Sequence, residues 1–389
     1  MTLLEIVIPT RNRERTLVPS VRAILAALGD RNYRIAIADN SDVALDRSIQ
    51  EEFAASGRVV YRHNPHTVDV IENFNSALAQ ADGKYVTLIG DDDFVLPEIF
   101  NAIEILESEK LDCLIHPRPA YYWPDVTFDR EFDFFRPATL LIGETMSDRI
   151  EQLEPASELD RVRAAGAIYL YNLPALYHAL LRSDALHRIK QTFGDYVLGP
   201  SPDMSLAVAL CALDVRYARS SIPFSVAGAS YNSAAGMGRR GAHTAALDRA
   251  PSWLPISMKE QWDPRLPEVW NGYSVYAQSL ISVARVAGLD TDLNLPKLFK
   301  KMIAEDLSDM PHVRQKLSSL GLRQGLGVIV LGTAEGVLRR LLTRLPAAVL
   351  NRLIRRRPHF RGLHQYGGIL SPQACIACAE AHIAARRPA

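Results

Sequence analysis

The chain has 389 residues, of which 48% are hydrophobic and 23% are charged, and its 44 Lys and Arg balance its 44 Asp and Glu. These values are ordinary for a soluble globular protein, and the length predicts two domains or one large domain with an appendage. Four cysteines in a chain this long exclude a disulfide framework and favour a reducing compartment.

Nothing in the sequence predicts export or a membrane span. Residues 1–4 lead directly into "EIVIPT", with no basic region and no cleavage site, so we expect no signal peptide. The most apolar uncharged run near the C-terminus, residues 326–334, is far shorter than the roughly 20 residues of a spanning helix. We therefore expect a cytoplasmic protein.

Strand-like and helix-like runs alternate over the first 120 residues. The expected strands are 4–10, 33–39, 58–63, 84–90 and 112–117, and the expected helices are 14–28, 42–55, 68–81 and 97–109. Helices of this length between strands imply right-handed crossovers, and hence a mostly parallel sheet covered on both faces. Ligands of such sheets bind beyond the carboxyl ends of the strands. The polar stretches "PTRNR", "DNSD" and "GDDD" all fall there.

The rest of the chain is less regular. Residues 121–158 are aromatic-rich and read as a lid or binding insert, and residues 162–230 form a further half-domain. The loop 227–244 is rich in Gly, Ser and Ala, so it is either a connector or a flap whose Arg239, Arg240 and His243 close over a phosphate group. Beyond residue 251 the pattern is mainly helical.

The residues after the first two strands could bind a nucleotide. Asp39 could accept a hydrogen bond from a base, and the backbone of residues 10–13 could line its pocket. The alternative is that Asp39, Asn40 and Ser41 cap the next helix. "PTRNRE" contains no glycine, which argues against a Rossmann dinucleotide site and a P-loop.

Asp91, Asp92 and Asp93 follow the fourth expected strand directly. Mg²⁺ or Mn²⁺ is held by one or two carboxylates together with substrate phosphates, and such an ion neutralises a leaving diphosphate. The alternative is an acidic turn before the helix at Pro97. Three adjacent acids exceed what a helix start needs, so we favour the metal site.

These motifs resemble glycosyltransferase family 2. The resemblance rests on "EIVIPTRNRERTL", "IADNSD", "ENFNSALAQADGKYVTLIGDDDFVLPE" and "GPSPDMSLAVAL", which occur in the family's order and cover about residues 3–235. It implies an α/β protein of the GT-A fold, with a mostly parallel central sheet flanked by helices and a mainly helical C-terminal region. It also implies an inverting, metal-dependent enzyme that uses nucleotide sugars. We divide the chain into a catalytic domain, 1–245, and a helical region, 246–389.

The resemblance assigns roles at the strand ends. Aligned on Pro97, the family's first motif acid falls on Gly90 and its second on Asp92. Asp92 is then the main metal ligand. Asp91 is a second ligand that could instead reach the ribose, and Asp93 looks structural. The resemblance also implies contacts to the donor nucleotide. Asp39 would contact the base, and Pro9 and Thr10 would line the pocket of the base. Arg11, at a position where the family varies, and Asp91 complete the donor contacts.

Asp203 is the expected catalytic base. Inverting transfer is a single in-line displacement, so a base must remove the proton of the acceptor hydroxyl. The family places an acid, often paired with a second one, at the start of a helix after the metal motif. Here Asp203 follows Pro202, where the family prefers an acid. The alternative is a helix start made by Ser201, Pro202 and Asp203; Asp195 is the reserve base.

The C-terminal region carries a basic amphipathic segment, residues 320–362. Between residues 311 and 362 there are eleven Lys and Arg but one acid, Glu335. Leucines and valines recur there at helical spacing, which is typical of a helix lying on an anionic membrane surface. The alternative is a helix packed on the catalytic domain with a solvated basic face. Cys375 and Cys378 form C-x-x-C near His382, a weak zinc signal with three local ligands.

The expected function is that of a glycosyltransferase of the inverting, hexosyltransferase type. It would transfer a sugar from a UDP- or dTDP-sugar donor to a hydroxyl of a saccharide or lipid-linked acceptor, with Mn²⁺ or Mg²⁺ as cofactor and no nucleic-acid partner. We expect a cytoplasmic location, with a peripheral position at the inner face of the cytoplasmic membrane if the basic segment binds lipid. Gly90 and Pro202 support an alternative, a non-catalytic, degenerate GT-A binding module at a membrane surface. The oligomeric state, the sugar and the linkage stay open.

Overall fold

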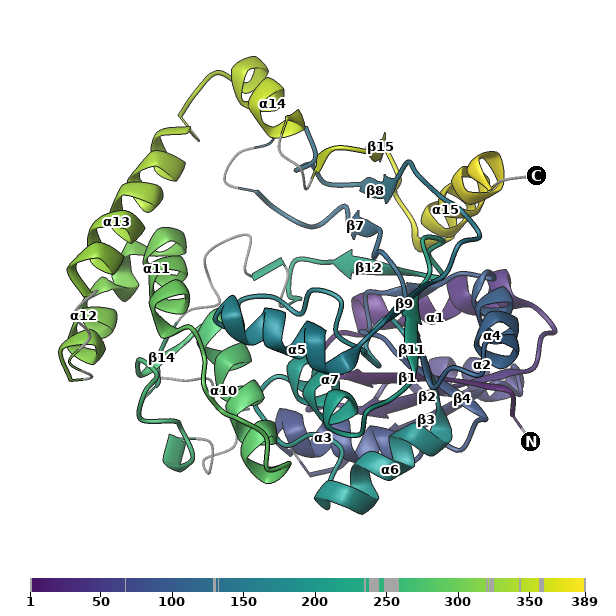
Figure 1. Cartoon of the computed structure of the whole chain (residues 1–389). Helices are drawn as coiled ribbons and strands as arrows, with labels where there is room; N and C mark the ends of the chain where they lie inside the picture. Colours follow the sequence, from purple (N-terminus) through teal and green to yellow (C-terminus); the bar gives the residue numbers. More distant parts are fainter. Residues whose placement is uncertain are drawn as a thin grey trace.

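The computed structural model describes residues 2–66, 68–128, 131, 133–233, 236–237, 245–247, 259–319, 321, 325–342, 344–356 and 360–387. Its larger β-sheet, seen near the centre of Figure 1, has the strand order β3-β2-β1-β4-β10-β6-β11-β9. The strands are β1 (Leu4–Thr10), β2 (Tyr33–Asp39), β3 (Val59–His63), β4 (Tyr85–Leu88), β6 (Cys113–Ile115), β9 (Glu151–Leu153), β10 (Leu180–Arg182) and β11 (Tyr217–Arg219).

The predicted mostly parallel sheet is confirmed. β1 pairs in parallel with β2 and β4, and β2 pairs in parallel with β3. β10 lies antiparallel between β4 and β6, and β9 lies antiparallel at the edge beside β11. These two short strands come from the half-domain and the insert, where the sequence pattern did not define strands.

Helices cover both faces of this sheet, because side chains of a strand alternate between its two faces. Leu4, Ile6 and Ile8 of β1 join one core with residues of α1 (Glu14–Leu28), α2 (Arg47–Ala55) and α4 (Ile99–Ser108). Val7 points into a second core with α3 (Val70–Leu78) and α7 (Pro202–Ala212). α5 (Pro155–Ala164) and α6 (Ser183–Phe193) also pack on this second side.

The first three elements, β1, α1 and β2, have the predicted bounds. α2 begins at Arg47 instead of residue 42. The cause is local: the Asp42 backbone N–H donates to Asn12 Oδ1 at 2.9 Å, and the Asp42 carboxylate accepts from Asn12 Nδ2 at 2.8 Å. These bonds hold residue 42 against the loop after β1.

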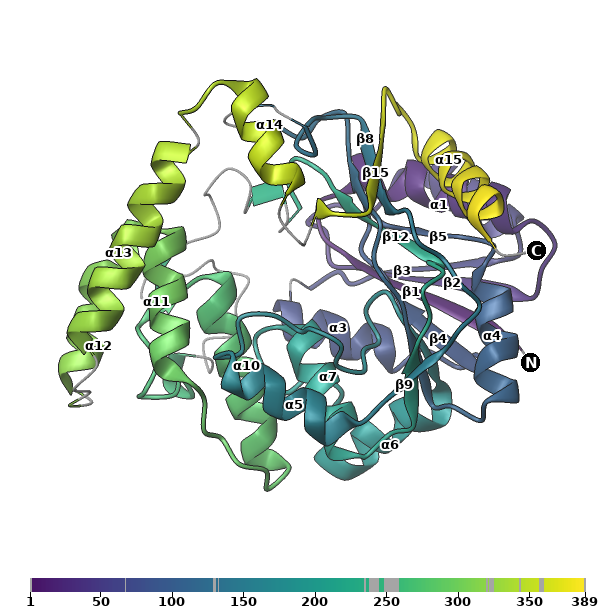
Figure 2. The same ribbon diagram turned by 45° about the horizontal axis from the view of Figure 1, so that its top comes forward.

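A second sheet lies beside the carboxyl ends of the first and has the order β15-β8-β7-β12-β5. Its strands are β5 (Phe94–Val95), β7 (Ala120–Tyr122), β8 (Thr139–Gly143), β12 (Ser225–Ala229) and β15 (Leu363–Gly367). The final helix, α15 (Pro372–Arg386), shares a core with this sheet and with α1, as Figures 1 and 2 show. The C-terminal residues thus return to the N-terminal half of the molecule.

The remaining elements make the mainly helical C-terminal region. They are β13 (Ala245–Ala246), β14 (Val269–Trp270), α10 (Gly272–Val286), α11 (Leu295–Glu305), η2 (Leu307–Asp309), α12 (Met310–Ser319), α13 (Gly325–Leu342) and α14 (Ala347–Arg355). α13 lies against α11 (Figure 2), and two glycines allow this approach. A Cβ on Gly332 would lie 3.0 Å from Ile303 Cβ, and one on Gly336 would lie 3.2 Å from Ile303 O.

The aromatic insert is not a lid. Tyr121 is fully buried and Tyr122 is 3% exposed in β7, and Phe134 joins Leu350 and Ile354 of α14 in a separate apolar core. The aromatic residues therefore form the apolar surface on which α14 packs. The domain boundary at residues 245 and 246 stays a prediction, since residues 238–244 and 248–258 lie outside the described ranges. No helix in the described ranges is both long enough and apolar enough to cross a bilayer.

Candidate active site

The three carboxylates, Asp91, Asp92 and Asp93, lie in the turn between β4 and β5, at the edge of the main sheet where the parallel strands end. None of them is more than 4% exposed. Buried carboxylates require partners, because removal from water penalises the charged form. Each of the three carboxylates has a different set of hydrogen-bond and ion-pair partners.

Asp91 faces the end of β1. Its Oδ2 accepts a hydrogen bond from Thr10 Oγ1 at 2.6 Å, and its Oδ1 lies 3.1 Å from Arg13 Nη1. Burial raises the pKa of Asp91 to about 7, against the opposing effect of the Arg13 guanidinium. Thr10 was a predicted site residue, whereas Arg13 was expected to contribute its backbone alone.

Asp92 faces the loop that follows β12. Its Oδ2 accepts hydrogen bonds from Ser230 N at 2.8 Å and from Ser230 Oγ at 2.7 Å. Its Oδ1 lies 4.0 Å from Arg13 Nη1. Burial raises the pKa of Asp92, and the neighbouring Asp93 carboxylate raises it further. Arg13 thus stands between two of the three acids.

Asp93 is the most fully bonded of the three. Its oxygens accept from Gly90 N and Gly228 N, both at 2.6 Å, and from Tyr177 Oη at 2.9 Å. His178 Nε2 lies 3.0 Å from Oδ2. Burial raises the pKa of Asp93, but His178 and the backbone donors outweigh it, and the pKa lies below its usual value. With both oxygens engaged in this way, Asp93 acts as a structural acid.

Gly90 occupies the position at which the family places its first acid, and the structure explains the glycine. A Cβ there would lie 2.8 Å from Tyr177 Oη and 3.0 Å from Asp93 Oδ2. Such contacts are too close to be tolerated without movement of the neighbours. The space of a first acid is thus taken by the Tyr177 hydroxyl group.

The predicted nucleotide residues lie together at the ends of β1 and β2. Pro9 pairs with Ala38, and Thr10 pairs with Asp39. Asp39 Oδ2 accepts from Tyr61 Oη at 2.6 Å, and Oδ1 accepts from Ser41 N at 2.8 Å. Arg11 Nη2 lies 3.4 Å from Asp42 Oδ1, and its buried Nη1 has no hydrogen-bond partner among the described residues. An unsatisfied buried N–H calls for an acceptor.

Asp203 lies in the first turn of α7. Ser201 accepts a hydrogen bond from Met204 N at 3.5 Å, and Pro202 fills the first turn, so the capping interpretation holds for Ser201. No described residue donates a side-chain hydrogen bond to Asp203. Burial raises its pKa, Arg118 and His178 oppose the rise, and Asp93 adds to it. Asp203 therefore lies within electrostatic reach of the carboxylate turn.

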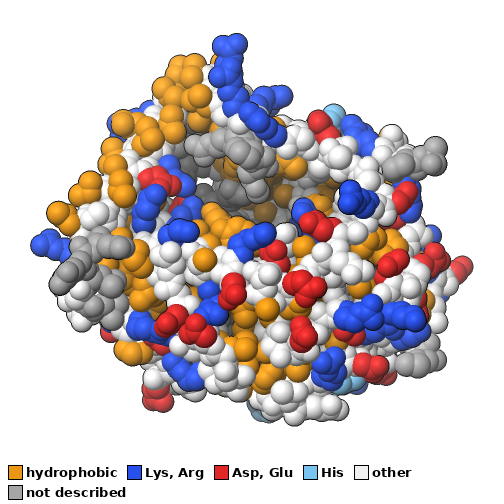
Figure 3. Space-filling model, viewed as in Figure 1, with side chains coloured by type: hydrophobic (Ala, Val, Ile, Leu, Met, Phe, Trp, Pro, Cys, Tyr) orange, Lys and Arg blue, Asp and Glu red, His pale blue; other side chains and the backbone are white. Residues whose placement is uncertain are grey.

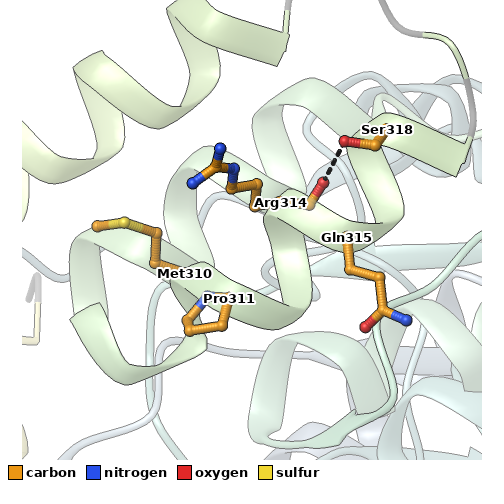
Figure 4. A pocket seen from close by; sticks show the side chains of 5 residues that line it. All are labelled: Met310, Pro311, Arg314, Gln315 and Ser318. Atoms are coloured by element: carbon orange, nitrogen blue, oxygen red, sulfur yellow. Dashed lines mark hydrogen bonds between the residues drawn. The ribbon is translucent and has the colours of Figure 1, made fainter.

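A cavity of about 260 Å³ opens beside the acids. It is lined by Asn12, Arg13, Arg15, Thr16, Asp125, Ser230, Tyr231 and Asn232. The two arginines supply the positive charge that a diphosphate requires. A larger cavity, about 410 Å³, lies on α12 and is lined by Met310, Pro311, Arg314, Gln315 and Ser318 (Figure 4). It contains no acid and is formed by one helix, so it has no part in this site.

A divalent ion would find few ligands here. The described residues contain no group of three or more His, Cys, Asp or Glu side chains able to hold a metal. Asp92 Oδ1 has Arg13 Nη1 4.0 Å away, and Asp91 Oδ1 has the same nitrogen at 3.1 Å. Two carboxylates are enough for Mg²⁺ or Mn²⁺ only where substrate phosphates and waters fill the other positions, and here both oxygens face the Arg13 guanidinium.

Sequence reasoning missed Arg13, Tyr177, His178, Gly228 and Ser230 as residues around the acids. Arg13 belongs to the "PTRNR" motif that was already singled out, and His178 is a polar residue inside an apolar run. The others reach the site through tertiary contacts. Arg239, Arg240 and His243 lie outside the described residues. Asp195 accepts from Tyr196 N at 3.0 Å, within the loop after α6.

The comparisons with known proteins agree with this architecture. Residues 5–155 match the model of the family described as Glycosyl transferase family 2, so the resemblance seen in the sequence is confirmed over that range. Among solved structures, S. aureus TarS residues 1–349 in complex with UDP-GlcNAc matches with a TM-score of 0.50 and 13% identity, over 91% of this chain and 92% of that chain. The same TarS fragment with UDP matches with a TM-score of 0.44 and 14% identity, over 87% and 92%. A search of curated proteins found no match. The first structural match confirms the predicted GT-A fold.

Proposed function

We propose that the protein is a glycosyltransferase of the inverting, hexosyltransferase type. It transfers a sugar from a nucleoside-diphosphate donor to a hydroxyl group of a saccharide or lipid-linked saccharide. The observation that carries the proposal is the common location of Asp39, the Asp91–Asp93 turn and Asp203 at one edge of a GT-A sheet, beside a cavity with two arginines. The TarS structure with UDP-GlcNAc makes a UDP-sugar the first donor to test, ahead of a dTDP-sugar.

The chain's own residues divide the work of transfer. Asp39 orients the base, and Arg11, Arg13 and Arg15 supply positive charge near the diphosphate. Asp203 accepts the proton of the acceptor hydroxyl as its oxygen bonds to the anomeric carbon, while the bond from that carbon to the diphosphate oxygen breaks. The raised pKa of Asp203 makes it a better proton acceptor than an ordinary aspartate, since an effective base has a pKa close to the working pH.

Asp92 and Asp91 would hold Mn²⁺ or Mg²⁺, which offsets the charge of the leaving diphosphate when bound. Arg13 lies 3.1 Å from Asp91 and 4.0 Å from Asp92, and it also lines the cavity. With an ion held by the carboxylates, the Arg13 guanidinium would be available to the donor phosphates.

Calorimetry with UDP tests donor and metal binding together. We expect UDP to bind the wild-type protein more tightly with Mn²⁺ than with a chelator, and Asp92→Asn to remove that difference. Asp125→Asn is the matched control, because Asp125 lines the same cavity and has no proposed role in metal binding. Equal binding with and without the ion would refute the metal assignment, whereas no UDP binding at all would favour the degenerate, non-catalytic module.

Turnover of the Asp203→Asn variant tests the base. We expect a loss of about 10²–10⁴-fold in kcat, the usual contribution of a positioned base, with UDP affinity unchanged. Asp195→Asn is the control and should retain activity. Full turnover by Asp203→Asn, measured as sugar-nucleotide consumption, would show that another group removes the proton.

A further inference from the structure

The outer side of α13 exposes an apolar stripe. Of the fourteen large hydrophobic side chains that are exposed in the described parts of the chain, six lie on α13 and two on α14. Those of α13 are 42% to 75% exposed and recur at intervals of three, four and seven residues, which places them on one side of a helix. The eight residues are Leu326, Val330, Leu331, Val337, Leu338, Leu341, Val349 and Leu353.

The inner sides of both helices are anchored to the protein, so this exposure is not a sign of a detached helix. Gly332 and Gly336 place α13 in direct contact with α11. Leu350 and Ile354 of α14 are 5% and 6% exposed and belong to the apolar core formed by the aromatic insert. We call the outward-facing residues of the two helices the α13–α14 face. In Figure 3 it appears as orange side chains along the upper left edge of the molecule.

Positive charge borders the stripe. Arg344, Arg352 and Arg356 are exposed, and none of them forms an ion pair with another described residue. Glu335 is the single acid between residues 311 and 362, and it is held by Lys300 at 3.2 Å and Arg339 at 3.1 Å on the α11 side of α13. The α13–α14 face therefore combines apolar surface with uncompensated cations.

We propose that the α13–α14 face binds the surface of an anionic lipid bilayer. Helices with an apolar stripe and a basic border lie in the interface, with the stripe buried at the level of the acyl chains and the cations among anionic headgroups. α13 has 18 residues, about 27 Å of helix, and lies along the molecule instead of projecting from it (Figure 2). This arrangement suits a helix parallel to the membrane plane.

Charge makes a second copy of the chain a poor occupant. A two-fold dimer would bury the same patch of both copies, and this patch offers no free carboxylate to either set of Arg344, Arg352 and Arg356, because Glu335 is already paired on the α11 side. Like charges brought together in an interface cost affinity. An anionic bilayer offers the opposite charge over the same area. Vesicle binding needs no donor or acceptor, and the inference therefore does not rest on the proposed enzymatic activity.

Sedimentation with vesicles tests the proposal on the full chain. We expect binding to phosphatidylcholine vesicles that contain phosphatidylglycerol, weaker binding to phosphatidylcholine alone, and release by salt. Replacing Arg344, Arg352 and Arg356 by Gln should weaken binding to the anionic vesicles about 100-fold, since each cation near such a surface contributes about fivefold in affinity. Leu338→Asp with Leu341→Asp should weaken binding to both kinds of vesicle.

The control is Val286→Asp, because Val286 is 56% exposed and belongs to α10 instead of α13 or α14. It should bind vesicles like the wild type. The midpoint of thermal denaturation, measured by circular dichroism on every variant, should be close to that of the wild type and reports that each has folded. Retention of wild-type vesicle binding by both sets of variants would overturn the proposal. A second result would also overturn it: the wild type does not bind vesicles but forms a dimer in light scattering, and the variant with Leu338→Asp and Leu341→Asp is a monomer.

Discussion

The Asp91–Asp93 turn and the arginines of the α13–α14 face are both clusters of like charge, and the protein accommodates them in opposite ways. Each buried carboxylate accepts hydrogen bonds from nearby donors. For Asp93 these donors include the backbone N–H groups of Gly90 and Gly228. The exposed arginines Arg344, Arg352 and Arg356 have no ion-pair partner within the described ranges. Water screens the second cluster but cannot reach the first. Substitutions in the two regions should therefore differ sharply in their effect on stability.

The largest expected effect is at Asp93. Asp93→Ala leaves the N–H groups of Gly90 and Gly228, the Tyr177 hydroxyl group and His178 without their common acceptor, so we expect a loss of about 3–5 kcal/mol in the free energy of unfolding. Urea denaturation measures it. Arg356→Ala, in the exposed cluster, should change the same quantity by no more than about 0.5 kcal/mol. Equal effects at the two positions would contradict the contrast between the clusters.

Asp309 is a buried carboxylate that has no ion-pair partner among the residues the structure describes. Its Oδ2 accepts from Asn271 Nδ2 at 2.7 Å, and burial raises its pKa to about 7. Between pH of about 4 and about 7, the Asp309 carboxyl group is therefore protonated in the folded state but ionised in the unfolded chain. The free energy of unfolding should fall as pH rises through this range, by up to about 4 kcal/mol. Asp309→Asn should abolish this part of the pH dependence in urea denaturation. Asp30→Asn, fully exposed, should leave it intact; an unchanged profile in Asp309→Asn would show that another group titrates.

A smaller effect is expected at Gly90. Gly90→Ala forces the new Cβ against Tyr177 Oη and Asp93 Oδ2, and we expect a loss of about 1–3 kcal/mol. Tyr177→Phe removes the closer of the two contacts, so the double variant should be more stable than the sum of the single changes predicts. Gly143→Ala in β8 is the control, since a Cβ there meets nothing within 4 Å. Additive changes in thermal denaturation would show that the two residues do not compete for space.

The first three elements of the fold were predictable because the information that specifies them is local. Residues 4–39 carry β-branched runs and helical spacing that need no distant partner to be interpreted, and their elements begin and end as predicted. β10 is three residues long and lies antiparallel between β4 and β6. A strand this short has no clear period, so only its neighbours in the folded sheet define it.

The site was predictable in its acids but not in their partners. Strand ends marked Asp39 and the Asp91–Asp93 turn, because parallel strands present their carboxyl ends at one edge. Ser230 reaches Asp92 from 138 positions away, and Gly228 reaches Asp93 from 135. Contacts at such separations leave no local pattern. The roles of Asp39, Asp92 and Asp203 in donor binding and transfer stay predictions until the variants are measured.

The position of β15 has a consequence for how the protein is made. β15 completes the second sheet by pairing with β8, and His382 of α15 meets the Gly143 carbonyl oxygen from 239 positions away. During synthesis, one edge of β8 therefore stays unpaired until residues 363–367 have left the ribosome. An edge strand left open in this way is where newly made chains associate wrongly. Early stop codons before residue 363 should accordingly yield insoluble protein instead of a shorter soluble one.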